Sequence, residues 1–197
     1  MLCKRSRALA VLIFLAAALC AIPAAAQEFT IPPGMPELRG PMLVTPCGQS
    51  PGGVYVKVIC RQVKIEADLE DDAQVETLAA KPYKTLMIIT GTSLKGMGSA
   101  GVDLDYEIKR CEAVVKKAKA MGMKVIIAQI EGPSRRVDDS DEKSIRSMTP
   151  LGDLLITQKD INGDGYFTKT AAEKKIPQIF IAQQLDLLKL FPLIFKI

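Results

Sequence analysis

The stretch Thr85–Ile130 decides the fold, and it reads TLMIITGTSLKGMGSAGVDLDYEIKRCEAVVKKAKAMGMKVIIAQI. It begins with the apolar run Thr85–Thr90 and ends with a second apolar run, Lys124–Ile130. Runs that are apolar on both faces are typical of strands buried in a parallel sheet. Between them, apolar residues recur every three or four positions over Val102–Met121, as in an amphipathic helix. This strand–helix–strand order predicts a right-handed crossover between two parallel strands.

The same alternation continues on both sides of this stretch. Further strands are expected at Pro41–Thr45, Val63–Ala67, Leu151–Thr157 and Ile176–Ala182. Further helices are expected at Gly53–Gln62, Asp71–Ala80, Thr168–Lys175 and Leu185–Phe195, and a polar loop is expected at Glu131–Pro150. Residues 41–197 are therefore predicted to form a single α/β domain. The expected architecture is a three-layer sandwich with a mostly parallel sheet of about five strands, flavodoxin-like or Rossmann-like.

Two of the expected helices carry predictions about their buried faces. In the helix at 53–62, we place Val54, Val58 and Cys60 toward the core. In the helix at 102–121, the basic residues, Arg110 among them, are expected mainly on the solvent-exposed face.

The N-terminus has the composition of a secretory signal peptide. Lys4, Arg5 and Arg7 form a positively charged segment, and the uncharged apolar run 9–21 follows it. Small residues at 24–26 complete the pattern and predict cleavage before residue 27. The apolar run is too short to span roughly 30 Å of hydrocarbon at about 1.5 Å per residue. We therefore expect a signal peptide at residues 1–26, a periplasmic or extracellular location, and no stable membrane insertion after cleavage.

Composition narrows the classes of partner and enzyme. Without the three basic residues of the predicted signal, the net charge of +4 falls to about +1, which is too low to indicate nucleic-acid binding. The Pro- and Gly-rich segment 27–40 is expected to be an extended linker or arm. The chain has no histidine, which excludes a Ser–His–acid catalytic triad.

Three cysteines, Cys47, Cys60 and Cys111, follow the predicted signal. This odd number leaves at least one thiol without an internal partner. A Cys60–Cys111 disulfide stays an alternative because exported proteins meet an oxidising environment. We favour buried free thiols, since a domain of this size can form a core without crosslinks.

A ligand is expected at the carboxyl ends of the predicted strands. In open α/β sheets, ligands bind beyond these ends, near the switch in strand order. Four loops leave them, at residues 47–50, 91–96, 131–141 and 158–167. Three of these loops are rich in glycine, serine and charged residues, so we expect a polar site at this edge of the sheet.

The first loop contains residues 48–52, GQSPG, which match the G-x-S-x-G pattern of a nucleophile elbow. The absence of histidine opposes this function, and Pro51 lacks the backbone N–H that the oxyanion hole would need. The simpler interpretation is a turn in which Ser50 caps the next helix and Pro51 is its first residue. Two alternatives stay open: Gln49 and Ser50 contact a ligand, or Cys47 is a nucleophilic thiol near the helix start.

The second loop leads to residues 96–101, GMGSAG, which match the G-x-G-x-x-G pattern of dinucleotide-binding loops. The motif starts well beyond the end of the strand, and Asp103, Asp105 and Glu107 would repel a pyrophosphate at the helix start. We therefore favour a glycine-rich turn followed by acidic residues that cap the next helix. Lys95 precedes the first glycine, whereas a Walker A lysine follows its glycines.

The third loop holds the pair Arg135 and Arg136. Adjacent arginines can fork onto a carboxylate or phosphate of a ligand. They can equally pair with the acidic residues of segment 138–142, and both alternatives stay open.

The fourth loop contains residues 160–165, DINGDG, which match the opening of a calcium loop. Asp160, Asn162 and Asp164 are the candidate ligands. The acidic residue needed at the twelfth position is missing because Ala171 stands there. We therefore favour a turn that leads into a helix, and no cofactor is predicted.

Residues 91–107, GTSLKGMGSAGVDLDYE, followed by Arg110, resemble a family of exported bacterial proteins known only as a domain of unknown function. The turn 48–50, the pair Arg135-Arg136 with 140–141, and the segment 164–168 add to the resemblance, which covers roughly residues 41–195. Relatives often have His where Gln129 stands and Gly where Glu131 stands. If that His is catalytic or binds a metal, this member of the family is altered. The resemblance implies an exported domain with a polar site and no established activity.

The leading hypothesis is a non-catalytic binding module for a small polar or anionic ligand. Its contacts are expected from three loops, with backbone donors from Gly91 and Gly96 and side chains from Gln49, Ser50, Thr92, Ser93, Lys95, Arg135 and Arg136. One alternative is a histidine-free enzyme with Glu131 as base, Lys95 as electrophile and Cys47 as nucleophile. Another is an interaction module in which the apolar C-terminal helix or the Pro-rich arm binds a protein partner.

Overall fold

A computed structural model describes residues 29–196 and places six parallel strands in one sheet. The predicted signal peptide and the first two residues of the predicted linker lie outside the described residues. The strand order is β3-β2-β4-β5-β6-β7. These strands are β2 (Met42–Cys47), β3 (Ala67–Leu69), β4 (Thr85–Thr90), β5 (Lys124–Gln129), β6 (Leu154–Gln158) and β7 (Gln178–Ile181). The order is the flavodoxin-like one with an added strand, and it confirms the predicted α/β class.

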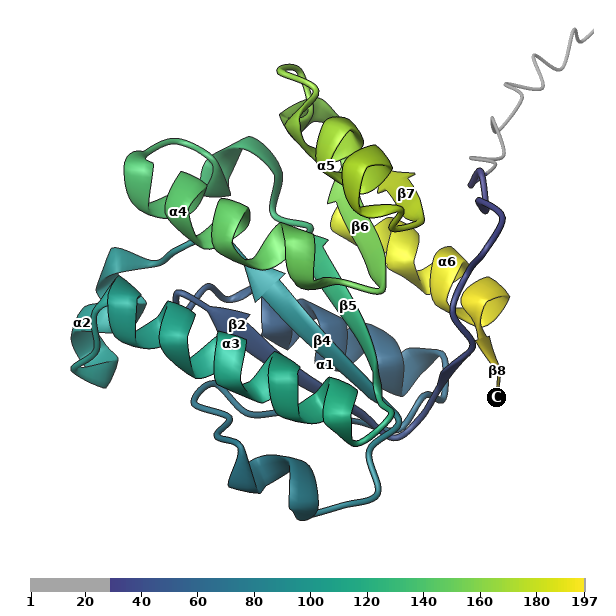
Figure 1. Cartoon of the computed structure of the whole chain (residues 1–197), viewed down its shortest axis with the longest axis horizontal. Coiled ribbons are helices and arrows are strands. Elements are labelled where there is room, and N and C mark those ends of the chain that lie inside the picture. The colour runs from purple at the N-terminus through teal and green to yellow at the C-terminus, as the bar shows by residue number, and fades with distance from the viewer. Residues whose placement is uncertain (1–28, 197) are drawn as a thin grey trace, which may run out of the picture.

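Helices cover both faces of the sheet and give three layers (Figure 1). One core contains side chains from α1 (Gly52–Gln62) and α6 (Leu187–Ile194). The core on the other face contains side chains from α3 (Leu104–Ala120), α4 (Asp139–Met148) and α5 (Tyr166–Lys174). The inner strands β2, β4, β5 and β6 are buried on both faces over most of their length, as their continuous apolar runs predicted.

Two predicted elements between β2 and β4 are wrong in detail. The strand expected at residues 63–67 is displaced to β3, because the chain first turns through Lys64, whose φ is 60°. The acidic helix expected at 71–80 is reduced to a 3-10 turn, η1 (Glu76–Ala79).

The segment expected as a polar loop at 131–150 contains the helix α4, preceded by the 3-10 turn η2 (Gly132–Arg135). Asp138 caps α4 by accepting hydrogen bonds from the backbone of Ser140 and Asp141. Segment 131–150 contains so many charged residues that its sequence is typical of a loop. Only one narrow face of α4 is buried, so the helix has little apolar periodicity. The later elements lie within three residues of their predicted bounds.

The glycine motif at 96–101 is part of a helix, so it is not a strand-to-helix loop. α2 (Leu94–Ala100) includes its first residues, and Gly101 ends the helix with φ 69°. Asp103 then caps α3 by accepting a hydrogen bond of 2.8 Å from the backbone of Tyr106. This confirms the acidic cap and removes the loop geometry that a dinucleotide pyrophosphate would need.

Two predicted helix faces are corrected. Val54 and Val58 of α1 are 53% and 51% exposed, and Val56 and Ile59 are buried in their place. α1 is apolar on nearly every side, so its periodicity could not select one face. Arg110 of α3 is buried, with only 5% exposure.

The segment before β2 packs on the domain. β1 (Leu38–Arg39) pairs in parallel with β8 (Phe195–Lys196), and Leu38 is fully buried. Figure 1 shows this segment running beside α6. Its C-terminal part is therefore attached to the end of the chain, whereas we expected an extended linker.

All three cysteines of the described chain are free and buried, as favoured from the sequence. Cys60 belongs to one core, and Cys47 and Cys111 belong to the core on the other face, so the sheet separates Cys60 from Cys111. Burial raises the pKa of Cys60 to about 12. A hydrogen bond with Cys47 and burial raise the pKa of Cys111. Within residues 29–196, no helix has both the length and the apolar character needed to cross a bilayer.

The packing of α6 can be tested with two substitutions in the same helix. Phe191 is fully buried, so Phe191→Ala should lower the free energy of unfolding by about 3–5 kcal/mol through loss of burial and a remaining cavity. Leu193 is 66% exposed, so Leu193→Ala should leave the free energy of unfolding nearly unchanged. Urea unfolding measures both changes. Equal losses for the two variants would contradict the helix orientation.

Candidate binding site

The turns that follow β2 and β4 lie side by side at the carboxyl edge of the sheet. The two strands are neighbours at the point where the strand order reverses. The carbonyl of Gly48 accepts a hydrogen bond of 2.7 Å from the backbone of Ser93. Gln49 and Thr92 form an antiparallel bridge. This is the crevice in which open α/β sheets bind their ligands.

The turn after β2 has an unusual backbone conformation. Gly48 has φ 114°, and a Cβ there would lie 2.8 Å from the Thr92 side chain. Gln49 has φ 58°, which is rare for a residue with a Cβ and costs on the order of 1–3 kcal/mol. The Gln49 amide donates hydrogen bonds to the backbone oxygen of Asp71 (2.9 Å) and to Glu107 (3.1 Å). The side chain thus helps to hold its own backbone in place.

A buried ion pair supports this turn from below. Glu107 and Arg110 of α3 are 0% and 5% exposed, and their closest charged atoms are 2.9 Å apart. Glu107 also accepts a hydrogen bond of 2.9 Å from the backbone of Gly48. Arg110 donates to the oxygens of Thr45, Pro46 and Ala73, at 3.1, 2.6 and 2.9 Å. The i,i+3 spacing of Glu107 and Arg110 is the sequence signal from which this pair could be predicted.

A second buried carboxylate, Asp141 of α4, holds the turn after β4. One of its oxygens accepts hydrogen bonds from the backbone (2.7 Å) and the hydroxyl (2.9 Å) of Thr92. The other accepts from the backbone of Val137 at 3.0 Å. Ser144, also on α4, donates to the carbonyl of Cys47 at 2.6 Å and accepts from Gly91 at 3.3 Å. Both turns are therefore held in place by polar side chains of α3 and α4.

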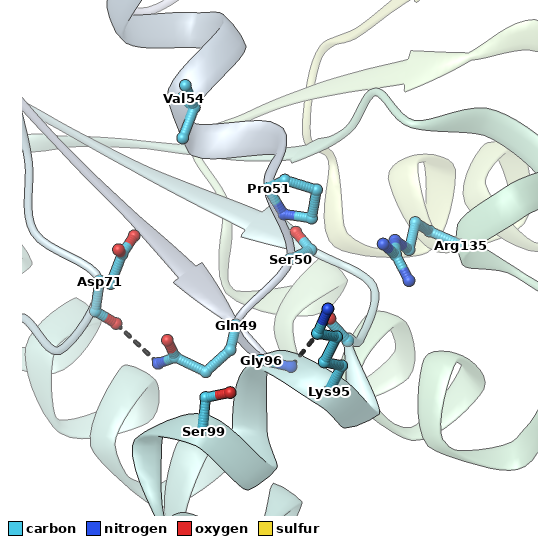
Figure 2. A pocket seen from close by; sticks show the side chains of 10 residues that line it. Gln49, Ser50, Pro51, Val54, Asp71, Lys95, Gly96, Ser99 and Arg135 are labelled. Atoms are coloured by element: carbon cyan, nitrogen blue, oxygen red, sulfur yellow. Dashed lines mark hydrogen bonds between the residues drawn. The ribbon is translucent and has the colours of Figure 1, made fainter.

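A pocket of about 410 Å³ opens beside the two turns (Figure 2). It brings together six of the nine residues predicted to contact a ligand. These six are Gln49, Ser50, Ser93, Lys95, Gly96 and Arg135, and the other lining residues are Pro51, Val54, Asp71 and Ser99.

Ser50 has an unpartnered hydroxyl in this pocket. It is 3% exposed, and its Oγ has no hydrogen-bond partner within the described chain. The predicted helix cap is wrong: Pro51 is the N-cap residue of α1, and no side chain caps this helix. The start of α1 therefore presents backbone N–H groups and the positive end of the helix dipole beside Ser50.

Two basic side chains reach the same space. Figure 2 shows the ends of Lys95 and Arg135 on the side of the pocket next to Ser50, with Asp71 on the far side of Gln49. Lys95 is exposed and forms no ion pair with any residue from 29 to 196. Arg135 donates to the carbonyl of Thr92 at 2.8 Å and lies 3.5 Å from a carboxylate oxygen of Glu131, which leaves part of its donor set unused.

Three of the predicted contacts, Gly91, Thr92 and Arg136, do not line the pocket. Thr92 is buried and bound to Asp141. The backbone N–H of Gly91 is donated to Ser144, and that of Gly96, which does line the pocket, is donated to Ser93. Both donors expected from the glycines are therefore already used within the chain.

Arg136 points away from Arg135 and forms the local ion pairs that were one of the two alternatives for these arginines. It binds Glu142, the carbonyl of Ile161, and Asp164, the last at 2.7 Å. These hydrogen bonds from Arg136 hold the pKa values of Glu142 and Asp164 below their usual range. Arg135 faces the pocket, and Arg136 joins α4 to the start of α5.

The loop that resembles a calcium site is occupied by contacts within the chain. Asn162 accepts hydrogen bonds from the backbone of Phe167 (3.0 Å) and Thr168 (3.4 Å), and Asp164 is held by Arg136. Asp160 accepts a hydrogen bond of 3.3 Å from Gln158. No group of three or more acidic, cysteine or histidine side chains suited to a metal occurs in residues 29–196. The loop caps α5, as the simpler interpretation predicted.

The family model described as "Domain of unknown function (DUF6305)" matches residues 39–195. The chain belongs to this family. The match confirms the expected membership in a family of unknown function. Among curated proteins, none matches the sequence significantly.

Several solved structures share the general arrangement at low similarity. A GDSL-like lipase from Bacteroides thetaiotaomicron is 12% identical, with a TM-score of 0.35, and the match covers 71% of this chain and 66% of the lipase. The esterase EstA from Pseudoalteromonas is 10% identical, with a TM-score of 0.34, and the coverage is 71% and 76%. A GDP-L-fucose synthetase from Naegleria fowleri bound to NADP is 13% identical, with a TM-score of 0.37, and the coverage is 76% and 51%. Similarity at this level concerns the α/β fold and carries no activity over to this chain.

The role of the buried pair can be tested at Glu107. Glu107→Ala removes the buried counter-charge of Arg110 and leaves only the exposed Asp72, 3.6 Å away, so the free energy of unfolding should fall by about 3–5 kcal/mol. Glu112, one turn further along α3, is exposed, and Glu112→Ala should change the free energy of unfolding by less than about 0.5 kcal/mol. Urea unfolding of the two variants gives the comparison. A loss below about 1 kcal/mol for Glu107→Ala would show that the pair does not support the turn.

The contacts of Arg136 predict a pH dependence. Because the pKa values of Glu142 and Asp164 are lowered in the folded state, their stabilisation is complete above about pH 4.5 and is lost as the pH falls through the lowered values. Arg136→Gln should therefore be less stable than the wild type at neutral pH, and the difference should shrink below about pH 4.5. Thermal unfolding between pH 3 and 7 measures it. The exposed Arg61→Gln is the control, and its difference from wild type should stay flat.

Proposed function

We propose that this chain is an exported binding protein for a small anionic ligand, which it holds in the pocket beside the turns after β2 and β4. The observation that carries the proposal is that Ser50 lines the pocket and has a buried hydroxyl without a hydrogen-bond partner among residues 29–196. A buried polar group without a partner costs about 1–3 kcal/mol. A ligand oxygen that accepts a hydrogen bond from this hydroxyl would remove that cost.

The charge around Ser50 favours an anion. Lys95 and Arg135 provide two positive side chains, and the uncapped start of α1 adds partial positive charge. The one acidic residue that lines the pocket, Asp71, lies on the other side of Gln49 (Figure 2). A carboxylate or phosphate group bound next to Ser50 would meet all three sources of positive charge. Two of them, Arg135 and the start of α1, also face the buried carboxylate of Glu131, so Lys95 is the positive group that Glu131 does not contact.

The histidine-free enzyme has less support. Cys47 is fully buried in the core, so its thiol does not reach the pocket. Glu131 lines a different pocket from Lys95. The three side chains assigned to that mechanism are therefore not gathered around one space.

A protein partner is the second candidate function. Val58 of α1 and Leu193 of α6 are 51% and 66% exposed, and their helices belong to the same layer. Val58→Lys and Leu193→Lys should abolish complex formation in the exported fraction if this surface binds a partner. An unchanged set of co-purifying proteins would remove this candidate.

Ser50 gives the sharpest test of the anion pocket. Ser50→Ala removes an unpartnered buried hydroxyl, so the unliganded protein should be as stable as the wild type or more stable by up to about 1 kcal/mol. The same substitution should weaken the binding of inorganic phosphate or succinate about fivefold, because a net hydrogen bond of about 1 kcal/mol is lost. Urea unfolding and isothermal titration calorimetry measure the two effects.

Lys95→Ala should weaken the same binding tenfold or more, as expected for loss of a charge-assisted contact of about 1.5–3 kcal/mol. Lys116→Ala, an exposed lysine on α3, is the control and should bind like the wild type. If the wild type binds neither anion, or if Lys95→Ala binds as well as Lys116→Ala, the pocket is not an anion site.

A further inference from the structure

A second pocket lies further along the same edge of the sheet. It follows the carboxyl ends of β5, β6 and β7 and has a volume of about 400 Å³. Its lining residues are Tyr55, Glu131, Gln158, Gln183, Gln184 and Leu185. Glu131 is the only charged residue among them, so this pocket differs in sign from the one that contains Lys95 and Arg135.

The carboxylate of Glu131 is buried and only partly neutralised. Its side chain is 5% exposed. Oε1 lies 3.5 Å from Arg135 Nε, at the limit of a hydrogen bond, and Oε2 has no hydrogen-bond partner within the described chain. Oε2 packs against the start of α1, where a Cβ on Gly52 would lie 2.7 Å from it. A buried carboxylate oxygen without a donor is unfavourable, and a donor from a ligand would satisfy it.

The rest of the lining supplies acceptors and an aromatic ring. The side chains of Gln158 and Gln184 have amide oxygens that can accept a hydrogen bond, whereas the Gln183 side chain already accepts one from the backbone of Asp186. Tyr55 and Leu185 are 48% and 61% exposed, so they can contact the apolar part of a bound molecule. A cation beside a tyrosine ring gains a further favourable interaction. A single carboxylate is few charged ligands for a divalent metal, which prefers several oxygens at once.

We propose that this second pocket binds a small organic ammonium group, with Glu131 as its counter-charge. An alkylammonium has three N–H donors and a positive charge, which match the free oxygen of Glu131 and the neighbouring amide oxygens. Its alkyl chain lies against Tyr55 and Leu185. This pocket adjoins the anion pocket at the contact between Glu131 and Arg135, but the inference does not rest on the function proposed there.

Isothermal titration calorimetry of the whole exported chain with n-butylammonium chloride tests the site, with 1-butanol and sorbitol as uncharged probes. The wild type should bind n-butylammonium and neither uncharged probe. Glu131→Gln, which keeps the shape and removes the charge, should weaken the binding tenfold or more, and the exposed Glu112→Gln should not. Tyr55→Leu should weaken it about two- to fivefold, and this exposed position keeps the test valid if Glu131→Gln fails to fold.

Absence of n-butylammonium binding by the wild type would overturn the proposal. Equal binding by Glu131→Gln and Glu112→Gln would overturn it too. Binding of sorbitol in place of the ammonium would show that the pocket takes a polyol. Phosphate binding by Tyr55→Leu, measured in parallel, reports on the first pocket, because Tyr55 lines only the second of the two pockets. Failure of one site is therefore distinguishable from failure of the other.

Discussion

The buried pair of Glu107 and Arg110 is the interaction on which the edge of the sheet depends. It joins α3 to the end of β2 and to the turn that follows, through the backbone of Gly48 and the carbonyl of Pro46. Two buried charges are costly unless their remaining hydrogen-bonding capacity is satisfied. Here backbone groups in and next to the turn provide the remaining hydrogen bonds of Glu107 and Arg110. The turn therefore needs the buried pair to keep its conformation, and the pair needs the turn to be stable in the core. Gln49 is held at a positive φ as a result.

This constraint explains why unsatisfied groups gather at one edge of an otherwise well-satisfied structure. Ser50 and Glu131 hold the two buried side-chain oxygens that lack partners among the described residues. Both lie next to the start of α1, which no side chain caps. A fold stabilised elsewhere can tolerate such groups, and they concentrate where ligands bind. The start of α1 thus separates two pockets of opposite charge.

The sequence predicted the parallel sheet because its strands are continuous apolar runs, and it predicted the edge at which the pocket lies because that follows from the fold class. The sequence-based prediction was wrong where one residue pattern is typical of two different structures. The charged residues of segment 138–146 serve both solvent contact and helix capping, so the sequence predicts a loop where α4 lies. The glycines at 96 and 98 suggested a loop, although they lie in α2. Arg135 and Arg136 are adjacent residues of the same type, so the sequence cannot tell their roles apart. The structure does, because Arg135 lines the pocket and Arg136 forms ion pairs with Glu142 and Asp164.

The central claim is that Ser50, Lys95 and the start of α1 form an anion site that exists before the ligand arrives. A crystal structure of the protein with tungstate, a heavy analogue of phosphate, tests it most directly. The account predicts an anomalous peak within hydrogen-bonding distance of Ser50 Oγ and Lys95 Nζ, with the turns after β2 and β4 unchanged from the unliganded crystal. An empty pocket in which the hydroxyl of Ser50 donates to a carbonyl of the chain, with tungstate bound only elsewhere, would contradict it.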